Sequence, residues 1–153
     1  MALMNYTTTV PVEKTVAELQ RMLARAGARA VLVDYDERGE PAALAFQIQT
    51  DLGLRGYRLP ANLEAVHKTL TQQWERRAVA RRFVTRDQAA RVGWRILKDW
   101  TAAQLAIIET RMVTLPQVML PWMIAGPSGE SLYELVERRQ LALPAADAVK
   151  GGS

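Results

Sequence analysis

The stretch TRDQAARVGWRILKDWTAAQLAIIE, residues 85–109, has the longest unbroken helical pattern in the chain. It contains no proline and one glycine, and its apolar residues recur at the three- and four-residue spacings of a helix. Thr85 followed by Gln88 forms a capping box, which predicts where this helix begins. Two neighbouring rows are apolar, one running from Ala89 to Ile107 and one from Ala90 to Ile108. A helix with so wide an apolar surface packs on two sides, so we predict that it is the core of the domain.

The positive charge of the chain is concentrated around this helix. The net charge is +4 over 153 residues, and residues 61–110 hold nine Lys and Arg against five Asp and Glu, whereas the parts before and after are balanced. Five arginines and no acid lie between Arg76 and Arg86. Such a run is usually a solvated surface, and the functional alternative is a patch that binds phosphate groups. The stripe of the central helix that carries Arg91, Arg95 and Lys98 is the one we expect to face water or a partner.

Composition excludes several classes of protein. The hydrophobic fraction of 49% and the charged fraction of 24% are typical of a globular domain. No window approaches the roughly 20 apolar residues of a membrane span, and the first residues do not resemble a signal peptide, so we expect a soluble cytoplasmic protein without a membrane partner. The chain has no Cys, which excludes disulfides, a thiolate nucleophile and a Cys-based zinc site.

The first 60 residues predict a small antiparallel sheet with one helix inserted early. Residues Asn5–Val12 alternate loosely and predict an edge strand, which Pro11 suits. Thr15 with Glu18 predicts the start of a helix that Gly27 ends. Three further strands joined by short turns are predicted at residues 28–35, 43–50 and 57–60.

The following residues, 61–142, predict the helical half of the same domain. Asn62 is expected to cap a helix that frays before Thr85. Thr114 is expected to cap a short helix over residues 115–120, and Ser131 or Ser128 to start a last one, SLYELVERR. The predicted fold is therefore α+β in the order β-α-β-β-β, covered by a C-terminal helical layer, in a single domain of residues 1–142. Residues 143–153 are expected to be a disordered tail, and their GGS end is typical of a linker remnant.

Residues of the types that carry catalysis are few. His67 is the only histidine, so a structural or surface role is favoured over a triad or a metal site. An acidic turn has oxygen ligands for a hard cation but not the EF-hand spacing, and we interpret it as a hairpin tip; it contains Asp34, Asp36, Glu37 and Glu40. Neither Gly-rich phosphate-binding motif is present.

The predicted order of helix, three strands and helix is also that of restriction-endonuclease-like nucleases. In that group an Asp and an E-x-K or Q-x-K tripeptide hold Mg²⁺ and activate water. Asp34 or Asp36 occupies the place of the Asp, and the tripeptide Gln47-Ile48-Gln49 lacks the lysine. We therefore expect no enzyme, no metal and no cofactor, although an enzyme whose carboxylates cannot be paired from sequence stays an option.

Arginine interleaved with aromatic residues is the strongest functional pattern. Arginine forks bind phosphate, and aromatic rings stack on unpaired bases. We predict stacking by Trp74 and Tyr57, with packing in the core as the alternative for each ring. The predicted nucleic-acid-binding residues are Arg76, Arg77, Arg81, Arg82, Arg86, Arg91, Arg95 and Lys98.

A second hypothesis rests on the stretch VMLPWMIAGP, residues 118–127. This Met- and Trp-containing segment is either an exposed apolar contact surface or part of the core. The exposed alternative fits an inhibitor or sequestering protein. A homodimer or higher homo-oligomer, formed by pairing of the edge strand or by helix packing, is a further expectation.

Three stretches of the chain resemble a family of small, uncharacterised proteins of bacteriophages and prophages. They are NYTTTVPVEKTVAELQ, YRLPANLEAVHKTL and TRDQAARVGWRILKDW, and the resemblance spans roughly residues 5–138. It implies a mobile-element protein acting in the bacterial host cytoplasm and supplies no catalytic residues. We therefore expect a non-enzymatic accessory protein that binds single-stranded or distorted nucleic acid. The alternative is an inhibitor or sequestering protein that binds a host (defence) protein or a small nucleotide signal.

Overall fold

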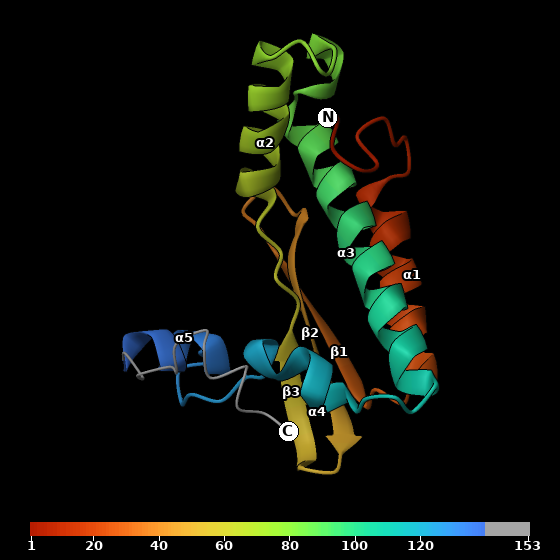
Figure 1. Ribbon diagram of the computed structural model, residues 1–153, viewed down its shortest axis with the longest axis vertical. Coiled ribbons are helices and arrows are strands. Elements are labelled where there is room, and N and C mark those ends of the chain that lie inside the picture. The colour runs from red at the N-terminus through yellow and green to blue at the C-terminus, as the bar shows by residue number, and fades with distance from the viewer. Residues whose placement is uncertain (140–153) are drawn as a thin grey trace, which may run out of the picture.

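A three-stranded antiparallel sheet with helices on one face forms the body of the molecule in the computed structural model, which describes residues 1–139 (Figure 1). The predicted α+β class is confirmed. The helices are α1 (Val12–Arg25), α2 (Leu63–Glu75), α3 (Arg86–Glu109), α4 (Leu115–Met119) and α5 (Leu132–Arg138), and two single 3₁₀ turns are η1 (Arg81–Phe83) and η2 (Leu120–Trp122). The strands are β1 (Ala30–Tyr35), β2 (Pro41–Thr50) and β3 (Gly53–Arg58).

The alternation of apolar and polar residues in β2 determines which face of the sheet is buried. Leu44, Phe46 and Ile48 point into the core, whereas Gln47 and Gln49 are exposed, as the sequence predicts. The strands lie in the order β1-β2-β3. Strand β3 begins earlier than the predicted 57–60, because a tight turn after Thr50 returns the chain at once. Gly53 takes a φ of 93° there, a conformation that glycine adopts without strain.

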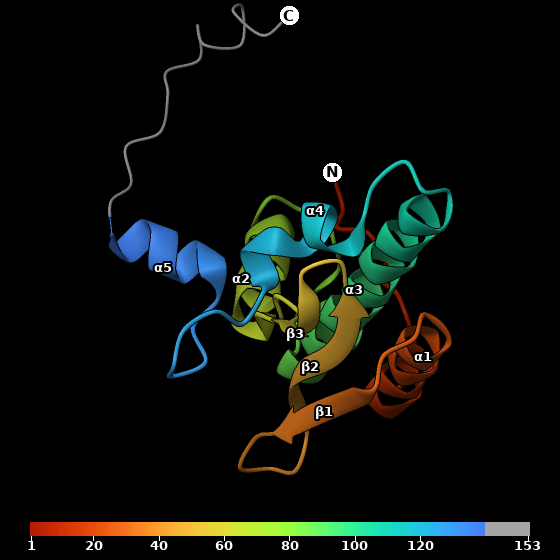
Figure 2. The ribbon, with the colours of Figure 1, turned by 90° about the horizontal axis from the view of Figure 1, so that it is seen from below.

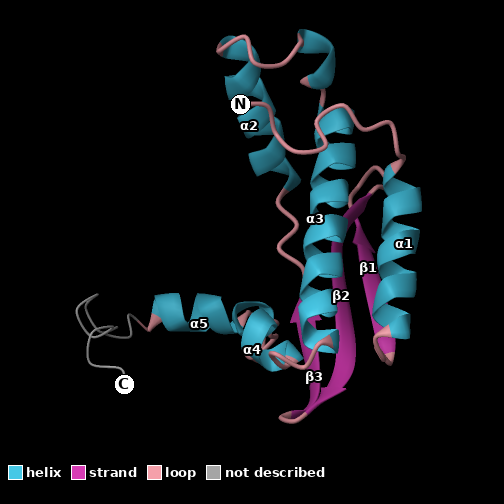
Figure 3. Ribbon diagram, turned by 45° about the vertical axis from the view of Figure 1, so that its right-hand side comes forward, coloured by secondary structure: helices cyan, strands magenta, loops and turns pink. Residues whose placement is uncertain are grey.

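Helix α3 is the central element of the molecule, as its apolar pattern predicts. Its N-cap Thr85 accepts a hydrogen bond from the backbone N–H of Gln88 at 3.1 Å. The other half of the predicted capping box is wrong, because the side chain of Gln88 bonds Tyr6, Thr8 and Arg91 instead of the backbone of Thr85. Trp94 and Leu97 are buried against residues of α1 and β2. Figure 3 shows α1 and α3 side by side across one face of the sheet, with α2 packed on α3 beyond the sheet. The helical layer is thus built from α1 as well as from the C-terminal half.

The predicted edge strand at Asn5–Val12 is wrong. Residues 1–11 contain turns and extended backbone, and they lie on α2 and α3 instead of joining the sheet. The side-chain Nε2 of the buried Gln88 donates to the carbonyls of Tyr6 at 2.8 Å and Thr8 at 3.0 Å, so these carbonyls have partners without a neighbouring strand. The expectation of a dimer formed by strand pairing at this segment is therefore no longer supported.

The start of α1 also differs from the prediction. The helix begins at Val12, directly after the extended Pro11, whereas Thr15 is wholly buried within it. Thr15 is no cap, because its hydroxyl accepts a hydrogen bond from Arg95 on α3. The predicted helix end is confirmed, since Gly27 follows the C-cap with a φ of 104°.

The chain after α3 first completes the core and then extends away from it. Thr114 and Ser131 cap α4 and α5 in capping boxes, which confirms both predictions and selects Ser131 over Ser128. Within residues 118–127, Met119 and Met123 are buried, and Trp122 packs edge-on against Trp100 with ring centroids 6.4 Å apart. The methionines and Trp122 therefore help to close the core, while Leu120 in the same stretch remains 39% exposed.

Helix α5 projects away from the sheet (Figure 2). The predicted tail at residues 143–153 lies outside the described residues. Within residues 1–139, no helix combines the length and the apolar character that crossing a membrane requires.

Candidate nucleic-acid interface and an apolar groove

Four of the predicted arginines lie together in the connection between α2 and α3, at one end of the molecule (Figure 1). We call residues 76–84 the arginine loop. Its four arginines are all exposed, and none has a carboxylate within 4.0 Å among residues 1–139; they are Arg76, Arg77, Arg81 and Arg82. This loop is thus a concentrated and unneutralised positive surface.

The loop has a defined conformation. Helix α2 ends where Arg77 takes a φ of 61° and the N–H of Ala78 donates to the carbonyl of Gln73 at 2.7 Å. Val79 is buried and holds the loop on the protein body, while η1 turns the chain toward the Thr85 cap. The guanidinium groups therefore project from an anchored segment.

Two aromatic rings accompany these arginines. The guanidinium of Arg81 lies over the ring of Trp74 at 5.6 Å, and that of Arg82 lies over Phe83 at 4.8 Å. Phe83 also packs edge-on against Tyr6, with the centroids 5.2 Å apart. Trp74 remains 39% exposed, so part of an indole ring is accessible beside the positive charges.

Tyr57 is not a stacking residue, contrary to the prediction. Its side chain is wholly buried and stacks on Phe46 with ring centroids 5.5 Å apart. Its hydroxyl has no hydrogen-bond partner among the described residues. Burial, assisted by the charge of Asp51, raises the pKa of the Tyr57 phenol above its ordinary value of 10.0. It belongs to the core, and no nucleic-acid base can reach it.

The remaining predicted basic residues do not extend the positive surface as a free stripe. Arg95 points at α1, where its guanidinium lies 2.7 Å from the carboxylate of Glu18, and only 18% of its side chain is exposed. The prediction of a water-facing stripe is therefore wrong at Arg95, because α1 covers it. Of the other three, Arg86 pairs with Glu64 at 2.7 Å and Arg91 bonds Gln88 at 2.9 Å, whereas Lys98 lies 3.6 Å from the adjacent Asp99 at the opposite half of the helix.

Two residues of the acidic turn, Asp36 and Glu40, line with His67 a second hollow of about 460 Å³ near the starts of α1 and α3. The carboxylate of Asp36 accepts hydrogen bonds from the N–H groups of Arg38 and Glu40, which is ordinary turn chemistry. His67 Nε2 lies 3.0 Å from the carbonyl of Val84. Among residues 1–139, no three His, Asp or Glu side chains come close enough to share a metal ion.

The residues compared with the nuclease motif do not form one site. Asp34 lies opposite Ala43 and Gln47 lies opposite Ala30 in the register of β1 and β2. These positions are four residues apart along the sheet, roughly 13 Å at the strand rise of about 3.3 Å per residue.

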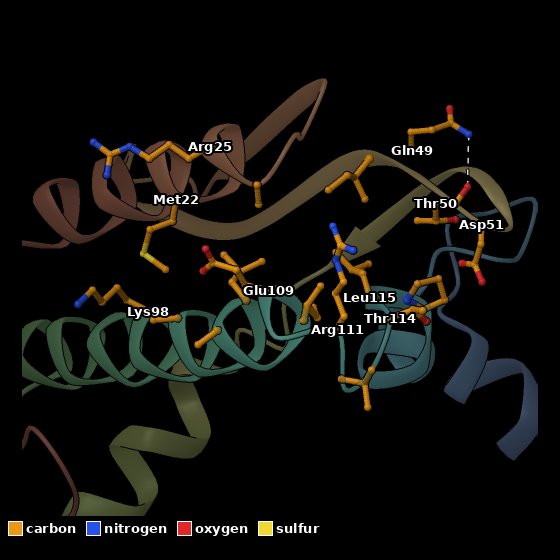
Figure 4. Close-up of a pocket in the computed structure, with 18 residues that line it drawn as sticks. Met22, Arg25, Gln49, Thr50, Asp51, Lys98, Glu109, Arg111, Thr114 and Leu115 are labelled. Carbon is orange, nitrogen blue, oxygen red and sulfur yellow. Dashed lines mark hydrogen bonds between the residues drawn. The ribbon is translucent and has the colours of Figure 1, made fainter.

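An apolar groove that the sequence did not predict lies at the other end of α3 (Figure 4). It has a volume of about 1000 Å³ between the end of α1, the second half of α3, the β2–β3 turn and the start of α4. Apolar side chains form most of its wall, among them Ile48, Leu105 and Ile108. Its charged lining residues are Arg25, Asp51, Lys98, Glu109 and Arg111. The signal in the sequence was the apolar pattern of residues 102–108, which we interpreted as core.

The arginine loop and the groove are separated by almost the whole of α3. The helix has 24 residues, which corresponds to about 35 Å. The two surfaces also differ in chemistry, because one is cationic and open to water while the other is largely apolar. Compared with protein-family models, curated proteins and solved structures, the chain has no match, so its function is argued from these surfaces.

Proposed function

We propose that this protein binds nucleic acid through the arginine loop, as a non-enzymatic accessory protein of a phage or prophage. One observation carries the proposal: four exposed arginines without a carboxylate partner lie within seven residues, from Arg76 to Arg82. Like charges so close repel one another, and a polyanion relieves this repulsion by supplying several phosphates at once. A guanidinium also presents paired donors that match phosphate oxygens.

The accessible ring of Trp74 favours single-stranded over duplex nucleic acid. Unpaired bases stack on exposed aromatic rings, whereas the bases of a duplex are already stacked on each other. Arg81 lies over Trp74 at 5.6 Å, so a base and a phosphate of the same strand are within reach of neighbouring side chains. The proposed ligand is therefore a single strand, or a distorted duplex with unpaired bases.

The proposal is tested by fluorescence anisotropy with labelled single-stranded DNA, duplex DNA and RNA of equal length. Each phosphate contact contributes a salt slope of about 0.7–0.9, so four contacts predict an affinity about 50- to 150-fold weaker at 200 mM than at 50 mM salt. Affinity that is unchanged over this range, or no binding at 50 mM salt, would refute the proposal.

Two pairs of substitutions locate the contact. Arg81→Ala with Arg82→Ala removes two proposed phosphate contacts and should weaken binding at least tenfold while reducing the salt slope by about 1.4–1.8. Arg21→Ala with Arg29→Ala is the matched control, because it removes the same charge from exposed positions outside the arginine loop. An equal loss in both pairs would mean that net charge, and not the loop, controls binding.

Trp74→Ala separates stacking from charge. It should weaken single-stranded binding by about 1–3 kcal/mol and leave duplex binding nearly unchanged. Equal effects on both forms would remove the preference for single strands from the proposal.

A further inference from the structure

We propose that the groove at the C-terminal end of α3 binds an elongated apolar molecule that carries one acid group. Its volume of about 1000 Å³ lies at the upper end of the range of roughly 300–1000 Å³ for small-molecule sites. The lining on α3 runs from Lys98 to Glu109, which corresponds to about 16 Å along the helix axis. Dividing the volume by that length gives a groove with a cross-section about 8 Å wide and 8 Å deep. This shape accommodates a fused ring system or a folded acyl chain.

The apolar part of the site comes from four different elements. Met22 extends from α1 toward α3 in Figure 4, and Ile48 from β2, Leu105 from α3 and Leu115 from α4 complete the wall. Only Ile48 and Leu115 among these are buried, at 7% and 8% exposure. The others keep apolar surface in contact with water, and covering such surface is favourable by about 25 cal/mol for each Å².

The cations of the groove determine the charge of the ligand. Arg25 lies in the last turn of α1 and Lys98 on α3, and Figure 4 shows them at the same end of the groove on opposite walls. Arg25 has no carboxylate within 4.0 Å among residues 1–139, and Lys98 has only the adjacent Asp99 at 3.6 Å. A third cation, Arg111, lies near the middle of the groove in Figure 4.

The carbonyl groups at the end of α1 have hydrogen-bond partners other than the guanidinium of Arg25. The last carbonyls of α1 accept hydrogen bonds from the backbone N–H groups of residues 26–28, which completes the helix end without a side chain. In Figure 4, Asp51 lies at the end of the groove away from Arg25 and Lys98, and the carboxylate of Glu109 lies between Arg25 and Arg111; among residues 1–139 neither acid has a cation within 4.0 Å. Arg25 and Lys98 therefore form the pair that receives the acid group, by charge-assisted hydrogen bonds beside an apolar wall.

Two dyes that differ only in their acid group provide the test. 1-Anilinonaphthalene-8-sulfonate carries a sulfonate, and N-phenyl-1-naphthylamine is the same ring system without it. Titration followed by fluorescence should give one saturable site, with the sulfonate bound about 10- to 100-fold tighter, which corresponds to a charge-assisted interaction of about 1.5–3 kcal/mol. Dodecanoate should displace the sulfonate dye, and dodecyltrimethylammonium should not.

Substitutions assign the binding to the groove. Ala106→Trp fills it and should abolish binding of both dyes, whereas Ala103→Trp places the same ring on an exposed position of α3 that does not line it. Arg25→Gln with Lys98→Gln should remove the preference for the sulfonate while the neutral dye still binds. Unaltered binding in Ala106→Trp, equal affinity of the two dyes for the native protein, or a preference that survives the Arg25 and Lys98 substitutions would overturn the proposal. Circular dichroism and urea unfolding of each variant verify that it is folded.

Discussion

Gly93 offers a sharp test of how α3 packs on α2. It is the glycine of the central helix, and a Cβ added there would lie 2.6 Å from Cδ2 of Leu63 and 3.3 Å from Cγ2 of Val66. Intrinsic helix propensity favours Gly93→Ala by about 1 kcal/mol. The close contact with α2 opposes it, because overpacking of this kind costs about 1–3 kcal/mol.

The two effects predict a net loss of stability of about 1 kcal/mol. The Leu63 methyl group is the end of a side chain and can turn aside, but Leu63 packs against the main core, so its displacement is resisted. If Leu63 is first shortened to Ala, the contact at 2.6 Å disappears and only the one with Val66 remains. In that background Gly93→Ala should become neutral or stabilising by up to about 1 kcal/mol.

Urea unfolding of the native chain, the two single variants and the double variant measures this sign reversal. The expected coupling free energy between the two positions is about 1–2 kcal/mol. Stabilisation by Gly93→Ala in the native background, or the same effect in both backgrounds, would refute the proposed contact between α2 and α3.

Three further substitutions test other contacts. Gln88→Ala removes two donors to the N-terminal segment, so amide exchange in residues 3–10 should accelerate roughly 30-fold, as expected for a local loss of about 2 kcal/mol. Arg95→Met leaves the carboxylate of Glu18 half-buried without its cation and should cost about 1–3 kcal/mol in urea unfolding, and less when Glu18 is replaced by Gln in the same chain. Tyr57→Phe removes a buried hydroxyl that has no partner and should leave the stability unchanged or raise it by up to about 1 kcal/mol. Because the pKa of Tyr57 is raised in the folded state, its contribution to stability is complete below the unfolded pKa of about 10 and declines at higher pH, and this decline should be absent in Tyr57→Phe.

The features predicted correctly from the sequence are those with local causes. The caps at Asn62, Thr85 and Thr114 depend on hydrogen bonds between residues three apart, so a short window contains all the information. The alternation in β2 likewise identifies its buried face without knowledge of its neighbours. Such signals hold wherever the rest of the chain is placed.

The features predicted wrongly depend on partners that are distant in the sequence. Arg95 looks like a surface residue on α3 until α1 supplies Glu18, 77 residues earlier. Tyr6 and its neighbours have the composition of a strand, but Gln88, 82 positions away, supplies the donor that a strand would have provided. Neither contact can be recognised from the local spacing of residues. The same spacing is equally compatible with an arginine exposed to water and with a segment paired to a second strand.

Both candidate sites arise where an apolar helix face extends past its packing partner. Leu70 of α2 is buried against α3, but Trp74, one turn further on, has passed the start of α3 and stays exposed beside the arginine loop. At the other end, Arg95 of α3 bonds Thr15 and Glu18 of α1, so α1 ends roughly 6–10 Å before α3 does, and Leu105 faces the groove beyond it. Helix lengths and caps, which the sequence does predict, thus carry information about sites. An apolar stripe that is longer than its neighbouring helix has to be covered by a loop, by another chain or by a ligand. The charged residues beside the uncovered stripe then indicate the charge of the ligand that covers it. They are arginines without acids at one end of α3 and Arg25 with Lys98 at the other.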